Sequence, residues 1–187
     1  PIAYMAALAH CKEAEIETKE TFPKQTYRNR AAIMTAGGIR TLTVPTIRSN
    51  HTTTDEVLID YKERWNVIHL RTIKAAYSAS PYYLYYKDEL EALVMQQHRR
   101  LIDLNTELLR WLVQKTKIEC HIEFTTDWHP PIGDKSDLRY SFSPKTPYPT
   151  DSHKPYYQVF ADRIPFTPNL SVVDLLMNLG PEAAAYL

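Results

Sequence analysis

The chain has 187 residues, enough for one domain with a sizeable core, and its 44% hydrophobic and 24% charged residues are typical of globular proteins. Lysine plus arginine and aspartate plus glutamate balance at 22 each, so no overall field attracts nucleic acid or an anionic membrane. No apolar run approaches the length of a membrane span, and no secretory signal opens the chain. Two distant cysteines, Cys11 and Cys120, are not a disulfide framework and favour a reducing compartment. We therefore expect a cytoplasmic protein with no nucleic-acid partner and no membrane span.

In the first half of the chain, short helices and strands alternate. Pro1 suits the first position of a helix, and Gly37-Gly38 between β-prone runs is a hairpin signal. Pro81 ends a helical pattern that begins near Trp65. The expected elements are a helix at residues 1–10, strands at 14–17, 31–35, 39–44 and 56–60, and a helix at 65–79.

In the second half, leucines recur at helical spacing over residues 82–116, which form either one helix or two helices broken near residues 96–98. The loop at residues 127–155 is too long for an ordinary connection and is either functional or mobile. The other expected elements are strands at 118–126 and 156–160, a helix at 172–178 capped by Ser171, and a last helical turn after Gly180-Pro181. The interleaving predicts a single α/β or α+β domain over residues 1–187, with a mixed sheet and packed helices.

The stretch Lys24-Gln25-Thr26-Tyr27-Arg28-Asn29-Arg30 is the densest candidate for function. In an extended segment, Lys24, Thr26, Arg28 and Arg30 point the same way. Three cations beside a hydroxyl can hold a phosphate or a carboxylate, and arginine does so through bidentate hydrogen bonds. The alternative is a solvated edge strand that its charges protect against aggregation.

Histidine and cysteine side chains offer further candidates. His69, on the predicted helix that also carries Arg71, is either a general base or a histidine satisfied in the core. Cys120-His121 and the nearby His129 include zinc-ligand types, but their spacing matches no compact zinc signature, so we predict no metal site. The signatures of P-loop, dinucleotide and esterase sites are absent, and the sequence names no cofactor.

Near the end of the chain, polar side chains recur on a predicted helix. Asp174 and Asn178 are four residues apart and therefore share one face of it. They either line a site or tie this closing helix to the sheet.

Six blocks of the sequence, in this order along the chain, resemble the WbqC-like family of bacterial proteins. They are KQTYRNR at residues 24–30, TLTVP at 41–45, WxxxHxRT at 65–72, PYYLYYKDEL at 81–90, DLNxxLLR at 103–110, and YYQVFADR followed by PNLSVVDLLMNLGPE within 156–182. Together they span nearly the whole chain.

The resemblance also implies two departures from the family. Relatives begin with an earlier strand, so we expect that this chain lacks one strand and that its sheet has an unfilled edge near residues 13–17. In the block at residues 137–145, Ser143 stands where relatives tend to have histidine.

The family is associated with surface-polysaccharide gene clusters, including those for O-antigen. The resemblance implies a transferase that attaches glycine or another amino-acyl or acyl group to a sugar or nucleotide-sugar. Its partners are then the sugar acceptor and the small acyl or amino-acyl donor. The alternative is a non-catalytic binding or assembly protein of the same pathway.

On this resemblance, the predicted catalytic residues are Lys24 and His69. The predicted substrate-binding residues are Gln25, Tyr27, Arg28, Asn29, Arg30, Arg71, Tyr157, Gln158, Asp162 and Asn169. Burying unpaired cations separately is costly, so we expect these residues to converge on one pocket, with Asp162 paired to Arg28 or Arg30.

Overall fold

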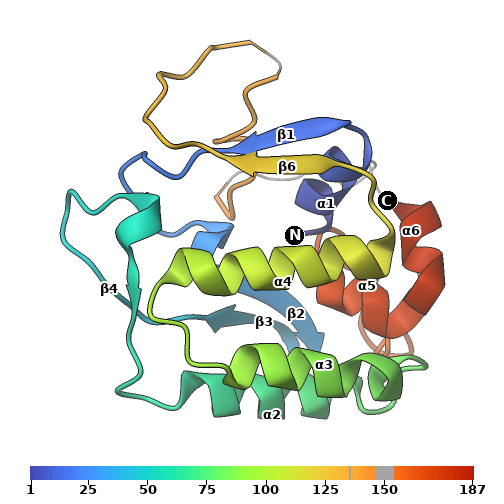
Figure 1. Ribbon diagram of the computed structural model, residues 1–187. Coiled ribbons are helices and arrows are strands. Elements are labelled where there is room, and N and C mark those ends of the chain that lie inside the picture. Colours follow the sequence, from blue (N-terminus) through green and yellow to red (C-terminus); the bar gives the residue numbers. More distant parts are fainter. Residues whose placement is uncertain (135, 146–153) are drawn as a thin grey trace.

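The computed structural model describes residues 1–134, 136–145 and 154–187 (Figure 1). Its helices are α1 (Ile2–Ala9), α2 (Trp65–Tyr77), α3 (Tyr83–Met95), α4 (Leu101–Thr116), α5 (Val172–Leu179) and α6 (Ala183–Tyr186). Its strands are β1 (Glu13–Ile16), β2 (Arg30–Thr35), β3 (Gly38–Thr43), β4 (Thr46–Ile47), β5 (Leu58–Ile59) and β6 (His121–Phe124). None of the helices in the described part of the chain has the length and apolar character that crossing a membrane requires.

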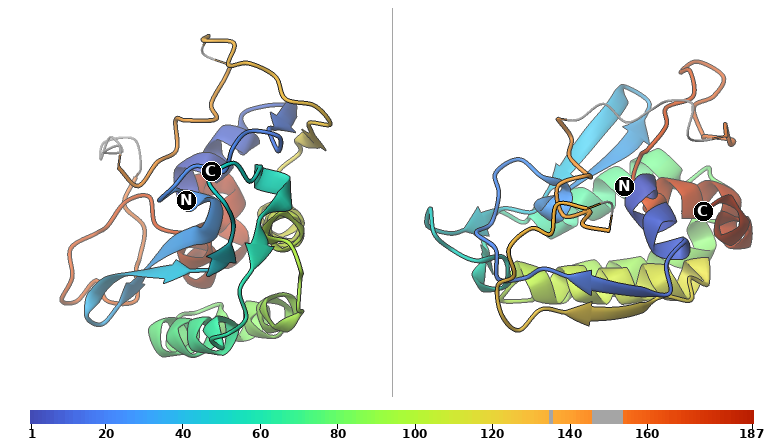
Figure 2. Two further views of the ribbon diagram at one scale, coloured as in Figure 1. Left: turned by 90° about the vertical axis from the view of Figure 1, so that its left-hand side faces the viewer. Right: turned by 90° about the horizontal axis from the view of Figure 1, so that it is seen from above.

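The expected mixed α/β class is confirmed, and the strands within the described residues form three two-stranded sheets. β1 and β6 run parallel, whereas β2 with β3 and β4 with β5 are antiparallel. The β1–β6 pair lies on one side of α4, and the β2–β3 hairpin with α2 and α3 lies on the other (Figures 1 and 2). Both termini lie beside α1 and the closing helices α5 and α6.

One hydrophobic core joins elements from both ends of the chain. Fully buried side chains come from α1 (Ile2), from α2 (Tyr77) and from α5 (Leu175 and Leu176). Because α5 contacts α1, α3, α4 and β2, it is the central element around which the others pack.

The predicted hairpin is confirmed, with a turn one residue earlier than the glycine pair suggests. Thr35 pairs with Gly38, so Ala36 and Gly37 connect the strands. Gly38 opens β3 with φ +97°, a conformation that side-chain-bearing residues rarely adopt. The second glycine of the pair is therefore the one whose conformation the hairpin requires.

The leucine-rich region is two helices, since α3 ends at Met95 and α4 begins at Leu101. Between them His98 is buried, and its backbone carbonyl accepts a hydrogen bond from the Tyr61 hydroxyl at 3.1 Å. At the other end of the chain, the Ser171 hydroxyl caps α5 by accepting from the backbone N–H of Val173, as predicted.

The strand predicted at residues 156–160 is wrong. Residues 154–158 have no regular structure and a turn follows them. The Gln158 side-chain amide donates to the Thr167 carbonyl at 2.9 Å and accepts from the Thr167 N–H at 3.0 Å. The buried Gln158 amide makes the two hydrogen bonds with Thr167 that a neighbouring strand's backbone would otherwise make, and so it closes a loop.

The resemblance predicts an unfilled sheet edge near residues 13–17, where β1 lies. Within the described residues, β1 pairs with β6 on one edge and with no strand on the other. The absent strand itself stays a prediction.

A buried polar network holds α5 in place. Asp174 is fully buried and accepts hydrogen bonds from the Tyr77 hydroxyl at 2.7 Å and the Tyr156 hydroxyl at 2.5 Å. Asn178 donates to the Asp174 carbonyl at 2.8 Å. Burial raises the pKa of Asp174, and burial together with this carboxylate raises the pKa of both tyrosines. Asp174 and Asn178 thus tie the closing helix to α2 and to the segment at Tyr156, the structural one of their two predicted roles.

Replacing Asp174 should therefore destabilise the fold. We expect Asp174→Ala to lower the free energy of unfolding by about 2–5 kcal/mol, because it leaves the buried Tyr77 hydroxyl and the partly buried Tyr156 hydroxyl without their acceptor. Urea denaturation measures the loss. The matched control is Asp162→Ala, whose side chain is 65% exposed and whose loss should stay within about 0.5 kcal/mol. Equal losses in the two variants would contradict this role of Asp174.

Candidate functional site

The carboxyl ends of β1 and β6 meet because the two strands are parallel. The residues just beyond them, Thr18 and Thr125, are buried and bind each other twice. The Thr18 N–H donates to Oγ1 of Thr125, and the Thr18 hydroxyl donates to the Thr125 carbonyl, both at 2.9 Å. These bonds continue the strand pairing and fix the segments that follow each strand.

Glu17, between β1 and Thr18, is held by donors from several segments. Its carboxylate accepts from the Lys19 N–H at 2.7 Å, the Thr125 hydroxyl at 3.0 Å and the His129 N–H at 3.3 Å. Burial alone would raise the pKa of Glu17, but these donors and the Arg139 guanidinium outweigh it and lower the pKa. Glu17 is therefore a largely buried carboxylate held in its ionised form.

Arg139 fastens the loop after β6 to the same place. Its Nη1 lies 3.7 Å from the Glu17 carboxylate and donates to the His129 carbonyl at 2.8 Å. Its Nε and Nη2 bind the two oxygens of Asp137, each at 2.9 Å. The side chains of Glu17, Asp137 and Arg139 are 6%, 9% and 13% exposed, so solvent screens this network weakly.

Arg28 binds the adjacent buried carboxylate of Glu20. The Arg28 side chain is 22% exposed and that of Glu20 is 5% exposed, and Nη2 of Arg28 donates to Oε1 of Glu20. The same Nη2 lies 3.5 Å from the Arg139 carbonyl, and the Arg28 carbonyl accepts from the Asn105 side chain of α4 at 2.7 Å. We call Glu17, Glu20, Arg28, Asp137 and Arg139 together the ionic cluster.

The backbone around Arg28 is not extended. Gln25 has φ +58°, and residues Tyr27–Asn29 form a 3₁₀ turn in which the Arg28 N–H donates to the Thr26 side chain. The alternation expected for Lys24, Thr26, Arg28 and Arg30 is therefore wrong. Lys24 and Gln25 are exposed, whereas the turn directs Arg28 inward to Glu20.

The flanking residues of this segment join it to the hairpin. Asn29 pairs with Val44 through its side chain at 3.0 Å and its carbonyl at 2.9 Å. Arg30 is the first residue of β2, and its buried Nε has no hydrogen-bond partner among the described residues. Tyr27 is partly buried, which raises its pKa. Asn29 thus has a structural contact, while Arg30 retains one unsatisfied donor.

His69 has neighbours of its own. Its ring packs edge-on against Trp65 with centroids 5.1 Å apart. Burial lowers the pKa of His69, although a hydrogen bond with the Thr43 backbone partly opposes the shift. Arg71, on the same helix, is exposed. These contacts connect His69 to the helix and the hairpin, while burial favours a neutral imidazole at pH 7.

The four C-terminal residues predicted to bind substrate have different surroundings in the structure. Tyr157 is 57% exposed, Gln158 closes its loop with Thr167, and the Asp162 side chain pairs with neighbouring Arg163 at 3.2 Å. Asn169, with φ +55°, accepts from the Ala3 N–H at 2.9 Å and so caps the first turn of α1.

The predicted pairing of Asp162 with Arg28 or Arg30 is consequently wrong, since Arg28 binds Glu20 and Asp162 binds Arg163. Among the described residues, no hydrogen bond or ion pair joins the Arg28 region to His69 or to residues 157–162. The side-chain partners of Arg28 in the structure are the Glu20 carboxylate and the Arg139 carbonyl. Residues 137–139 belong to a sequence block that resembles the family, and this block could have drawn attention to the loop. No local sequence feature distinguishes Glu17 or Glu20 from other charged residues.

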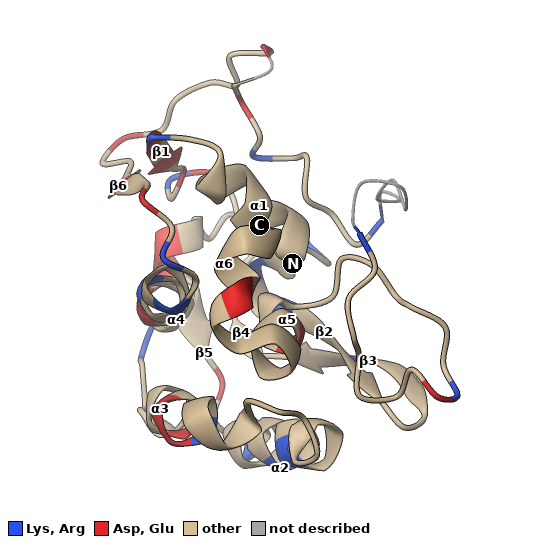
Figure 3. Ribbon diagram, turned by 90° about the vertical axis from the view of Figure 1, so that its right-hand side faces the viewer, with Lys and Arg blue, Asp and Glu red and all other residues tan. Residues whose placement is uncertain are grey.

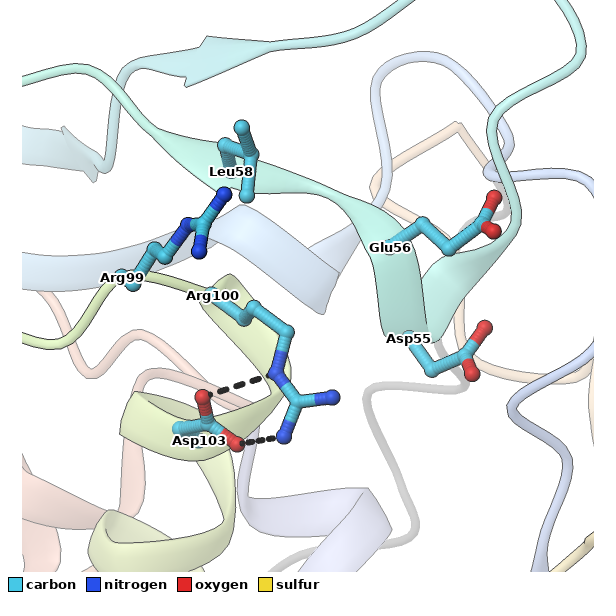
Figure 4. A pocket seen from close by; sticks show the side chains of 6 residues that line it. All are labelled: Asp55, Glu56, Leu58, Arg99, Arg100 and Asp103. Atoms are coloured by element: carbon cyan, nitrogen blue, oxygen red, sulfur yellow. Dashed lines mark hydrogen bonds and ion pairs between the residues drawn. The ribbon is translucent and has the colours of Figure 1, made fainter.

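A depression of about 500 Å³ lies between the 3₁₀ turn at Asp55 and the start of α4 (Figure 4). Asp55, which lines the depression, pairs with Lys19 at 2.7 Å, and the N–H of neighbouring Thr54 donates to the Glu20 carbonyl at 3.0 Å. These two bonds connect the depression to the segment that carries Glu20. Arg100 is already engaged by Asp103 through two bonds of 2.9 and 2.7 Å. The residues lining the depression are Asp55, Glu56, Leu58, Arg99, Arg100 and Asp103.

The depression offers charges of both signs, so a ligand with an anionic group and donor groups fits it better than a simple polyanion. Lysine and arginine are interspersed with aspartate and glutamate along the chain as a whole (Figure 3). No group of histidine, cysteine or carboxylate side chains within residues 1–134, 136–145 and 154–187 is arranged to hold a metal ion.

The low pKa of Glu17 makes a prediction about pH. Since this pKa lies below 4.5, the ordinary value, the ionised side chain contributes stability above that pH and the contribution is lost as pH falls through the folded-state pKa. We expect Glu17→Gln to lower the Tm most near neutral pH and progressively less below pH 4.5. Thermal melts from pH 7 to acid measure this, with exposed Glu119→Gln as the control. A Tm difference that does not change with pH would contradict it.

Comparison with known proteins identifies relatives. The profile described as the WbqC-like protein family matches residues 1–147. An uncharacterized protein of Mycobacterium tuberculosis, Rv1507c, is 26% identical over 214 residues, which cover 98% of this chain and 91% of that protein. No solved structure matches the chain. Because the profile match spans well over half of the sequence, the chain belongs to the WbqC-like protein family.

Proposed function

We propose that this protein is a transferase of surface-polysaccharide biosynthesis that attaches glycine or another amino-acyl or acyl group to a sugar or nucleotide-sugar. Family membership supports the pathway, since the resemblance implies a role in surface polysaccharides such as O-antigen. The two free cysteines favour a reducing compartment, so we place the reaction in the cytoplasm.

The observation that carries the site is the position of Arg28. Its guanidinium is held by a buried carboxylate, yet 22% of the side chain reaches solvent. Both of its side-chain hydrogen bonds within the described residues use Nη2, which leaves donors at Nε and Nη1. A guanidinium fixed in this way is preorganised to bind the phosphate of a nucleotide-sugar or the carboxylate of a small donor.

Carboxylate and aromatic groups complete the proposed acceptor site. Glu20 lies next to the Arg28 donors and can accept the proton or hydrogen bond of an attacking amine. Tyr140 is 61% exposed. Burial and the Glu20 carboxylate raise the pKa of Tyr140, which shows that the tyrosine lies close to Glu20. An exposed aromatic side chain beside fixed polar groups suits a sugar or nucleotide ligand. Exposed Lys24 and Gln25 would contact its outer part.

The alternative is a non-catalytic binding or assembly protein of the same pathway. It is favoured by the ion pairs within the ionic cluster, where two guanidiniums pair with three carboxylates. Such a network fixes a surface without performing chemistry. It predicts ligand binding without turnover.

One assay separates the two functions. The protein is incubated with a panel of nucleotide-sugars and with glycyl, other amino-acyl and acyl donors, and the products are read by mass spectrometry. A sugar whose mass increases by one acyl or amino-acyl group supports the transferase. Saturable binding of a panel member with no new mass from any pair contradicts the transferase and supports the binding protein.

Arg28 should matter for binding an anion rather than for folding alone. We expect Arg28→Lys to lower kcat/KM by about 100-fold, because the ammonium keeps the charge beside Glu20 but loses the planar fork of donors. Arg28→Ala is a poorer test, since an unpaired buried Glu20 would itself destabilise the protein by about 3–5 kcal/mol. Arg163→Lys, at an exposed ion pair, is the matched control and should leave kcat/KM unchanged. Wild-type kcat/KM in Arg28→Lys would remove Arg28 from the site.

The sequence allows His69 to be either a general base or a core histidine, and one variant decides between catalysis and packing. Because the ring contacts Trp65 and the Thr43 backbone, we expect His69→Gln to lower the Tm while transfer continues. Steady-state kinetics and thermal melts are measured on the same preparation. Abolished turnover at an unchanged Tm would instead assign His69 to catalysis.

A further inference from the structure

The two cysteines of the chain meet at the amino ends of β1 and β6. Cys11 lies just before β1 and Cys120 directly before β6, and their sulfur atoms are 3.4 Å apart. The parallel register, which places Glu13 opposite His121, brings these distant positions together. A backbone hydrogen bond from the His121 N–H to the Lys12 carbonyl at 2.8 Å joins the residues that directly follow the two cysteines.

Local contacts hold each thiol in this position. Cys11 follows α1, and both its N–H and its sulfur lie within hydrogen-bonding distance of the Leu8 carbonyl, at 3.3 and 3.5 Å. The Cys120 sulfur lies 3.8 Å from the His121 carbonyl. Both residues are partly exposed, so a small oxidant can reach them. The contact between the sulfurs is therefore built by the ends of three elements rather than by loose side chains.

We propose that Cys11 and Cys120 are a site of reversible covalent modification, at which a small-molecule disulfide oxidises the pair to an intramolecular disulfide. A disulfide needs its sulfurs about 2.05 Å apart. The sulfurs are already in contact, so small side-chain rotations close the remaining gap without moving the strands.

The reaction is two thiol–disulfide exchanges. One cysteine thiolate attacks a sulfur of oxidised glutathione, forming a mixed disulfide and releasing one glutathione thiolate. The second cysteine thiolate attacks the protein sulfur of that mixed disulfide and releases the other glutathione thiolate. The protein loses two protons and two electrons, and the glutathione disulfide gains them as two thiols. A dithiol reductant reverses both steps.

At neutral pH Cys120 is a protonated thiol and not a thiolate. Burial, followed by the hydrogen bond with Cys11, raises the pKa of the Cys120 thiol to about 11. Because the thiolate is the reactive form, exchange starts slowly unless the oxidant is abundant. This fits a pair that stays reduced in a reducing compartment and responds when that compartment becomes oxidising.

The cross-link would stabilise the fold through the unfolded chain. It joins residues 109 positions apart, and closing so long a loop removes much of the freedom of the unfolded state. We expect the oxidised protein to melt roughly 5–15 °C above the reduced protein.

The experiment uses the full chain with oxidised glutathione, followed by intact mass and peptide mapping. The expected result is a loss of two hydrogen atoms, one peptide pair linked through Cys11 and Cys120, a higher Tm, and reversal by dithiothreitol. The sequence has no other cysteine, so the link is unambiguous. Cys11→Ser and Cys120→Ser should each take up one glutathione and show no such rise in Tm.

Three outcomes would overturn the proposal. They are two separate glutathione adducts on the wild-type chain, a disulfide-linked dimer of two chains, or both thiols still free after treatment, as revealed by alkylation of the unfolded protein. Enzymatic activity enters none of these readouts, so the proposed transferase and the proposed modification site fail independently.

Discussion

The parallel pairing of β1 with β6 is the constraint on which both sites described above depend. It joins the start of the chain to the segment after α4, and it is only four residues long on each strand. Its carboxyl ends carry the bonded Thr18 and Thr125, beside which Glu17 is fixed. Its amino ends carry the two cysteines. The ionic cluster and the thiol contact both follow from one register of one short strand pair.

Local sequence signals predicted the elements whose geometry is set locally. The Ser171 cap of α5 and the β2–β3 hairpin depend on neighbouring residues and were predicted correctly. The strand at residues 156–160 was not, because a tyrosine- and valine-rich run favours a strand only where a partner backbone is present. Here the Gln158 amide supplies both hydrogen bonds, and its partner Thr167 is not marked by any motif.

The candidate site was predicted in part for the same reason. Arg28 stood out as one of three cations in a short polar run, yet its partners are Glu20 and the distant loop at Arg139. Glu20 occurs among ordinary charged residues, and nothing local shows that it is buried. The formal net charge of zero does not show which charged residues are buried, since buried and exposed residues count equally in it. The fold decides which arginine pairs with which carboxylate, because burial in the folded chain is what desolvates these charged groups.

The short β1–β6 pair also explains why its two ends need their own contacts. Both strands alternate between exposed and partly buried residues, so a slip of one strand by one residue would turn either Ile16 or Phe124 outward. Four residues bury too little to prevent that slip alone, and the threonine bonds beyond the carboxyl ends oppose it by pairing Thr18 with Thr125 in a single register. A covalent link between Cys11 and Cys120 would oppose it from the other end. The geometry of Glu17, and through Arg139 that of the ionic cluster, therefore depends on whatever fixes the register of these strands.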